Sequence, residues 1–136
     1  MIKQVVRLVI ISIAMYVALV TCISCGRRAI QPEDFEVFYQ EFLTSEEFQL
    51  SRIDFPLEGC ESDADTTIYW NTADDWAMLT GSIYDVDTTQ YKVEKSCSPL
   101  KVEHRVYIED SGFSITQTYE LHEGKWYLVL YDSMLN

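Results

Sequence analysis

The chain has 136 residues, with 22 acidic and 10 basic side chains, a formal net charge of −12 and 13% aromatic residues. Phosphate binding needs clustered lysine and arginine, so this balance argues against a nucleic-acid-binding protein and against a surface that lies flat on anionic lipid. No spacing of the four cysteines and two histidines suits zinc or an iron–sulfur cluster, so we expect no metal and no cofactor.

The first 25 residues have the layout of a secretory signal. Lys3 and Arg7 precede an uncharged, mostly apolar run that ends at Ile23, and the small Ser24 comes directly before Cys25. This arrangement resembles the lipobox of bacterial lipoproteins, in which the cysteine thiol receives lipid before cleavage. The resemblance implies a signal peptide over residues 1–24, fatty acyl groups such as palmitate on Cys25, and a lipidated tether over 25–31.

Two alternatives accompany this interpretation. Cleavage before Cys22 would place a bulkier residue at the critical position, so Cys25 is the better site. An uncleaved anchor helix would have to use residues 8–24, which are at the short end of the ~20 residues that span a bilayer. The lipoprotein interpretation implies a lipid-anchored protein of the cell envelope. Because Arg27 and Arg28 follow Cys25 in place of an acidic cluster, we expect it to face the periplasm.

Cys60 and Cys97 are the two cysteines beyond the leader, and an exported chain meets an oxidising compartment. We therefore expect a disulfide between them, which would contribute ~3–4 kcal/mol by constraining the unfolded chain. The alternative is a pair of separate buried thiols, since free cysteine packs as a small hydrophobe.

The length of residues 32–136 is typical of one domain, and we expect this domain to begin with helices. Pro32, Glu33 and Asp34 suit a helix start, and the apolar residues that follow recur at helical spacing: Phe35, Phe38, Tyr39, Phe42 and Leu43. Thr44 with Glu47 has the spacing of a capping box and predicts a second short helix that runs to about Arg52.

The middle of the chain is less regular. Residues 53–57 alternate and contain Pro56, which predicts an extended edge segment, and residues 58–65 read as an acidic loop. The β-branched and aromatic residues 66–70 predict a strand, and residues 72–75 predict a cap leading into a helical turn with Trp76. Residues 91–94 predict a short strand.

The last third predicts a three-stranded antiparallel meander. Residues 101–109, 113–121 and 126–131 alternate between apolar and polar side chains, with turns at 110–112 and 122–125. By this alternation Tyr127 and Tyr131 lie on the face opposite Trp126 and Leu128. Helices first and a meander last predict an α+β fold, with N-terminal helices packed on a curved antiparallel sheet.

Several stretches carry a resemblance to a known family. They are Phe35 to Phe42, Phe48-Gln49, Arg52 to Leu57, Trp70, Asp75-Trp76 and Gly124 to Leu128. They resemble a family of uncharacterised lipoproteins from Bacteroides and relatives, and the order of elements is similar to the cone-shaped fold of nuclear-transport-factor-two-like proteins. The resemblance implies a fold and an envelope location, and it implies no activity.

The candidate pocket residues lie on the inward strand face and near the predicted helical turn. His104 stands between Val102 and Val106, so its ring points inward, where it is either a general base or a hydrogen-bonded core residue. No nucleophile or motif accompanies it, and we assign no catalytic residue. The candidate pocket is formed by His104, Gln117, Tyr119, Trp70, Asp75 and Trp76.

The carboxylates of Asp75 and Asp54 each have two possible roles. Asp75 has either a pocket role or a helix-capping role, and we favour capping. Asp54 is either an ion-pair partner of Arg52 or a pocket acid, and we favour the ion pair. From the sequence we expect an envelope lipoprotein that binds a small ligand or an envelope protein without catalysing a reaction. The alternatives are a small periplasmic hydrolase or isomerase that uses His104 and an acid, and a structural subunit of an envelope assembly.

Overall fold

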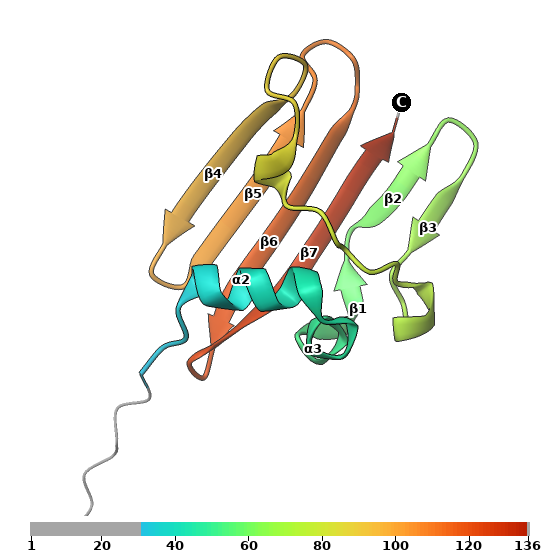
Figure 1. Ribbon diagram of the computed structural model, residues 1–136. Helices are drawn as coiled ribbons and strands as arrows, with labels where there is room; N and C mark the ends of the chain where they lie inside the picture. Colours follow the sequence, from blue (N-terminus) through green and yellow to red (C-terminus); the bar gives the residue numbers. More distant parts are fainter. Residues whose placement is uncertain (1–30, 136) are drawn as a thin grey trace, which may run out of the picture. The chain divides into compact units, whose positions relative to one another are not determined.

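Two α-helices and one mixed β-sheet make up the computed structural model, which describes residues 31–135 (Figure 1). The fold is α+β, as the sequence predicts. The predicted signal peptide, Cys25 and the tether as far as residue 30 lie outside the described residues. Neither of the two described helices is long and apolar enough to cross a membrane.

Helix α2 (Phe35–Thr44) begins at Asp34, whose side-chain oxygen accepts a hydrogen bond from the Val37 amide at 3.0 Å. The apolar stripe predicted for this helix is its buried face, made by Phe38, Tyr39, Phe42 and Leu43. Helix α3 (Glu46–Ser51) is capped by Ser45, one residue after the predicted Thr44. The Thr44 hydroxyl instead donates to the Gln40 carbonyl, within α2.

The sheet has the strand order β3-β2-β7-β6-β5-β4. Strands β4 (Lys92–Ser98), β5 (Lys101–Tyr107), β6 (Ser114–His122) and β7 (Lys125–Leu135) follow one another as antiparallel neighbours. Strands β1 (Ile53–Glu58) and β2 (Cys60–Asp63) both pair with β7 in parallel, and β3 (Thr67–Tyr69) closes that edge. The sheet is therefore mixed, where the sequence predicts an antiparallel one.

Gly59 is the reason that β1 and β2 run in the same direction along β7. It joins the two strands with φ +99°, a conformation that side chains disfavour, and a Cβ here would lie 2.2 Å from the Tyr131 carbonyl oxygen. The chain thus continues along β7 with no turn, and the residues predicted as an acidic loop contain strand β2.

The core lies between α2 and one face of the sheet. Tyr119 is fully buried at its centre, and its ring meets those of Phe38, Tyr39 and Phe42 edge-on at 5.7–5.9 Å between centroids. Strand β7 contributes Trp126, Leu128 and Tyr131 to the same core. Leu128 and Tyr131 are three residues apart and would face opposite sides of a regular strand, but one extra residue between them puts both on the same face.

That extra residue is Val129. Tyr119 pairs with Leu128 and Thr118 pairs with Leu130, so one residue of β7 is inserted between two successive pairs. The insertion reverses the alternation beyond it, and Tyr131 faces the core instead of the opposite face that the sequence predicts.

A long connection between β3 and β4 crosses the helix-bearing face of the sheet (Figure 1). It contains two 3-10 helices, η2 (Ala73–Asp75) and η3 (Ile83–Asp85). The buried Gln49 side chain holds its first half, because its amide oxygen accepts from the Trp76 indole and the Leu79 backbone, both at 2.8 Å. Its amide nitrogen donates to the Leu79 carbonyl at 2.9 Å.

Candidate functional site

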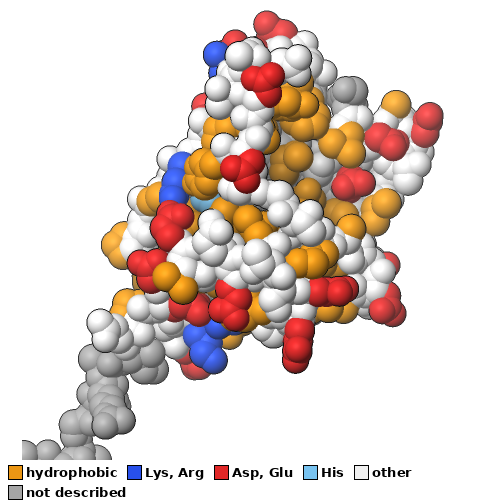
Figure 2. Space-filling view, viewed as in Figure 1, with side chains coloured by type: hydrophobic (Ala, Val, Ile, Leu, Met, Phe, Trp, Pro, Cys, Tyr) orange, Lys and Arg blue, Asp and Glu red, His pale blue; other side chains and the backbone are white. Residues whose placement is uncertain are grey.

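An apolar groove of about 340 Å³ lies between this connection and strands β5, β6 and β7. Figure 2 shows hydrophobic side chains gathered in a hollow on this face of the molecule. None of the lining residues carries a charge: Leu79, Gly81, Ser82, Ile83, Val86, Tyr91, Val106, Phe113, Ile115, Gln117 and Tyr131. Its size and its mostly apolar lining are typical of a small-molecule pocket.

Few contacts hold the connection along the groove. The Ile83 amide donates to the Tyr39 hydroxyl at 3.4 Å, and the Tyr84 hydroxyl lies 2.9 Å from His104 Nε2. At the other end, the rings of Tyr91 and Phe113 meet edge-on, 5.5 Å apart. The segment between these contacts has no regular structure after η3, so it forms a wall over the sheet without filling the space beneath it.

Gln117 supplies the amide group of the groove. Its side chain is only 4% exposed, and its Oε1 accepts a hydrogen bond from the Tyr119 hydroxyl at 3.0 Å. Its Nε2 makes no hydrogen bond with the described residues, and the only fully buried polar side-chain atom without a partner among them is His104 Nδ1. The Gln117 amide nitrogen is therefore reached through the groove that its side chain lines.

His104 is fully buried among aromatic rings beside the groove. Phe35, Tyr39, Tyr84 and Tyr119 contact its ring, with centroids 5.1–5.7 Å away. Burial, with a smaller contribution from the positive charge of Lys95 and against the opposing effect of Glu36, lowers its pKa from 6.5 to about 4. The imidazole is therefore neutral near pH 7. Its one hydrogen-bond contact is with Tyr84, and neither Asp54 nor Asp75 reaches it.

The six predicted pocket residues fall into three groups. His104, Gln117 and Tyr119 lie together on β5 and β6, where only Gln117 lines the groove. Trp70 and Trp76 form a second cluster with Tyr131, with ring centroids 5.2–5.6 Å apart. Asp75 is exposed, and its carboxylate accepts from the Thr72 amide and hydroxyl, which is the capping role favoured from the sequence.

Most of the groove wall was not predicted from the sequence. Residues 79–86 have neither helical nor strand periodicity, and their apolar members are isolated: Leu79, Ile83 and Val86. The available signal was weak, because three isolated apolar residues in a segment without periodicity do not by themselves predict a groove wall.

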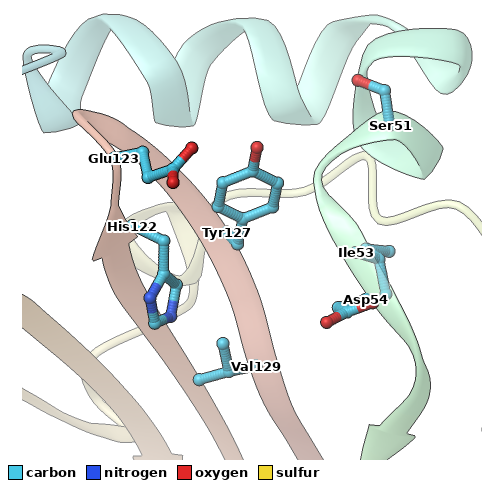
Figure 3. Close-up of a pocket in the computed structure, with 7 residues that line it drawn as sticks. All are labelled: Ser51, Ile53, Asp54, His122, Glu123, Tyr127 and Val129. Atoms are coloured by element: carbon cyan, nitrogen blue, oxygen red, sulfur yellow. The ribbon is translucent and has the colours of Figure 1, made fainter.

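A second hollow, of about 400 Å³, has a mixed polar and apolar lining and lies along β1 and β7 (Figure 3). Tyr127 alternates with the buried Trp126 and Leu128, so this hollow lies on the opposite side of β7 from the groove. Its lining comprises Ser51, Ile53, Asp54, His122, Glu123, Tyr127 and Val129. Asp54 thus lies in a hollow, whereas Arg52 pairs with Glu33 at 3.0 Å in place of the ion pair favoured from the sequence. Residues 31–135 contain no group of histidine, cysteine and acidic side chains arranged to hold a metal ion.

The fold separates Cys60 from Cys97. Both thiols are free, and β7, β6 and β5 lie between strand β2, which holds Cys60, and strand β4, which holds Cys97. Four strand spacings of ~4.8 Å amount to roughly 19 Å, whereas a disulfide needs Cα atoms within ~7 Å. In this structure the two thiols therefore lie too far apart for the bridge expected from the sequence.

Comparisons with known proteins give a family match and a similar solved structure. A family model described as "-like" matches residues 33–136. A solved structure titled "NMR structure of protein from Bacteroides uniformis ATCC 8492" is 25% identical, with a TM-score of 0.49, over 74% of this chain and 76% of the other. No curated protein matches the chain.

Proposed function

The chain belongs to the family whose model matches residues 33–136, and we propose that it is a lipid-anchored envelope protein whose domain binds a small molecule in the apolar groove. The observation that carries the proposal is the groove itself. It is uncharged, it has aromatic walls, and it presents the amide nitrogen of Gln117, which has no hydrogen-bond partner among the described residues. Binding pockets for small molecules combine such walls with few polar groups.

The enzymatic alternative requires an imidazole that is open to a cavity and has a carboxylate within hydrogen-bond reach. His104 has a different environment, since it is fully buried and contacts the Tyr84 hydroxyl. A lowered pKa at a closed core position describes a packed histidine better than a general base. The alternative of a structural subunit predicts an extended exposed apolar sheet face. Among the described strands, the large exposed apolar side chains are Ile68 and Tyr69 on β3 and Met134 and Leu135 at the end of β7.

Native mass spectrometry of the mature domain tests the ligand site. After incubation with a small-molecule extract of bacterial envelopes, the protein should carry an added mass. Val86→Trp, which fills the groove from its outer wall, should remove that mass. Val37→Trp is the matched control, because Val37 is 65% exposed on α2 and outside the groove. An added mass that survives Val86→Trp, or no added mass in the unchanged domain, refutes the site.

The envelope location rests on the leader and on Cys25. Expression of the full chain in a bacterium that processes lipoproteins should give a protein that begins at an acylated Cys25, measured by mass spectrometry. Cys25→Ala should abolish the acyl mass. A polypeptide that still begins at Met1 and carries no lipid contradicts the anchor.

We also propose that the domain has a cone-shaped fold. The order of elements and the aromatic face of α2 against β5 to β7 support the cone-shaped fold of nuclear-transport-factor-two-like proteins, with the helices in the concavity of a curved sheet. An experimental structure of the mature domain tests this, and a flat sheet with α2 detached from it would contradict it.

A further inference from the structure

We infer that the groove selects a neutral, mostly hydrocarbon molecule with a single hydrogen-bond acceptor, and that Gln117 Nε2 donates to that acceptor. This inference rests on the proposed ligand site and adds the chemical class of the ligand. Three features of the groove carry it: its unpaired donor, its lack of charge and its size.

The donor is fixed in place before any ligand arrives. Gln117 lies in the middle of β6, paired with His104 on one side and Tyr131 on the other. The Tyr119 hydroxyl donates to its Oε1, which leaves the amide N–H groups as the free end of the side chain. Because Nε2 is accessible through the groove, an acceptor on the ligand can take the place that solvent has at this donor in the empty groove.

The charge pattern selects against ionic ligands. A carboxylate in the groove would have no lysine, arginine or histidine among the lining residues to pair with, and the whole chain carries a formal charge of −12. An ammonium group would likewise meet no carboxylate there. Lys95, whose charge acts on the neighbouring His104, is itself paired with Glu36 at 2.8 Å.

The size limits the ligand further. At roughly 30 Å³ for each water-sized group, a groove of about 340 Å³ holds on the order of ten non-hydrogen atoms. The rings of Tyr91, Phe113 and Tyr131 form walls suited to a flat or compact apolar body. A benzene ring with one carbonyl group fits these limits.

Three probes of matched size separate the contributions: acetophenone, which carries a carbonyl oxygen; α-methylstyrene, its hydrocarbon isostere; and benzoate, its anionic counterpart. Dissociation constants come from NMR titrations of the mature domain at pH 7. Acetophenone should bind about fivefold more tightly than α-methylstyrene, the ratio expected for one neutral hydrogen bond. Benzoate should bind more weakly than either.

Gln117→Met keeps the length of the side chain and removes the donor, so it should abolish the preference for acetophenone over α-methylstyrene. Because this change leaves the Tyr119 hydroxyl unpaired, the pair Gln117→Met with Tyr119→Phe removes both partners and guards against misfolding. Gln40→Met, at an exposed position of α2, is the matched control and should keep the preference.

The outcomes distinguish the two claims. If none of the probes shifts the resonances of the groove residues, the proposed ligand site falls and this inference falls with it. If both neutral probes bind equally, or benzoate binds most tightly, the ligand class is refuted while the site stands. A preference for acetophenone that survives in the double variant also refutes the role of Gln117.

Discussion

His104 Nε2 lies 2.9 Å from the hydroxyl oxygen of Tyr84, so the centre of β5 is tied to the connection that walls the groove. The tie depends on a neutral, fully buried imidazole. Burial lowers the pKa of His104 and raises the pKa of the Tyr84 hydroxyl. Each shift favours the neutral form, so neither partner is ionised near pH 7. This contact, together with those of Tyr39 and Gln49, links the core of the domain to the wall of its groove.

Stability should fall in mild acid because of His104. Its pKa is 6.5 in the unfolded chain and about 4 in the folded one, so between these values the unfolded state binds more protons. This stabilisation is fully present above pH 6.5 and is lost as the pH falls to 4, a change of roughly 3 kcal/mol. Urea unfolding against pH should show that slope. His104→Gln should flatten it and His122→Gln, at an exposed position, should leave it; an equal slope in all three proteins contradicts the assignment.

Gln49 should be the most costly polar side chain to replace. Its amide satisfies the Trp76 indole and both backbone groups of Leu79. Gln49→Leu leaves these buried groups unpaired and should lower the free energy of unfolding by about 2–4 kcal/mol. Hydrogen exchange at the Leu79 amide should accelerate as well. Gln40→Leu serves as the exposed control, within ~0.5 kcal/mol of the parent, and a similar small effect of Gln49→Leu would count against this role.

Substitution by alanine should be costly at Gly59 and nearly neutral at Gly81. At Gly59 a Cβ meets the Tyr131 carbonyl oxygen at 2.2 Å and φ is +99°, so Gly59→Ala should cost several kcal/mol or prevent folding. Nothing lies within 4 Å of a Cβ at Gly81, and Gly81→Ala should change stability by less than ~1 kcal/mol. Thermal unfolding measures both, and equal effects would mean that β1 does not pass into β2 as described.

The stability of the domain should depend on the guanidinium group of Arg52 and not merely on its positive charge. Its two terminal nitrogens bind the two oxygens of Glu33 at 3.0 Å, and its Cζ lies 4.6 Å from the centroid of the Phe48 ring. Arg52→Lys keeps the charge but loses this geometry, and it should cost roughly 1–2 kcal/mol in chemical unfolding. Arg105→Lys is the control, because the Arg105–Glu94 pair is exposed and 3.9 Å apart. Equal costs would show that the paired geometry contributes nothing.

The two cysteines of the described chain should stay reduced and differ in reactivity. Cys97 is exposed on the edge strand β4, whereas burial and the neighbouring Asp132 raise the pKa of the Cys60 thiol. Timed alkylation at pH 8 followed by mass spectrometry should label Cys97 first. An oxidised mature domain that is monomeric and has no reactive thiol would contradict the strand order between them.

Local patterns were enough to predict the helices and the last strands. The apolar spacing from Phe35 to Leu43 and the alternation along β5 and β6 reflect a single buried face in each element, and burial decides their structure. His104 and Tyr119 were placed inward for the same reason, and both are fully buried.

The features that shape the sites depend on contacts between distant segments. Val129 breaks the alternation of β7 only because its neighbours pair with β6 at fixed positions, so Tyr131 could not be assigned to the core from its spacing. Strand β2 forms because Gly59 lets the chain follow β7, which no pattern within residues 58–65 reveals. The groove wall depends on Gln49, which lies 30 residues before Leu79.

The central claim is that the groove holds a small apolar molecule, and intermolecular NOEs between acetophenone and the mature domain test it most directly. The account predicts NOEs from the probe to Ile83, Phe113 and Ile115, which line the groove from the connection, the β5–β6 loop and β6. NOEs confined to the second hollow around Tyr127 and Val129, or an absence of NOEs at saturating probe, would contradict it.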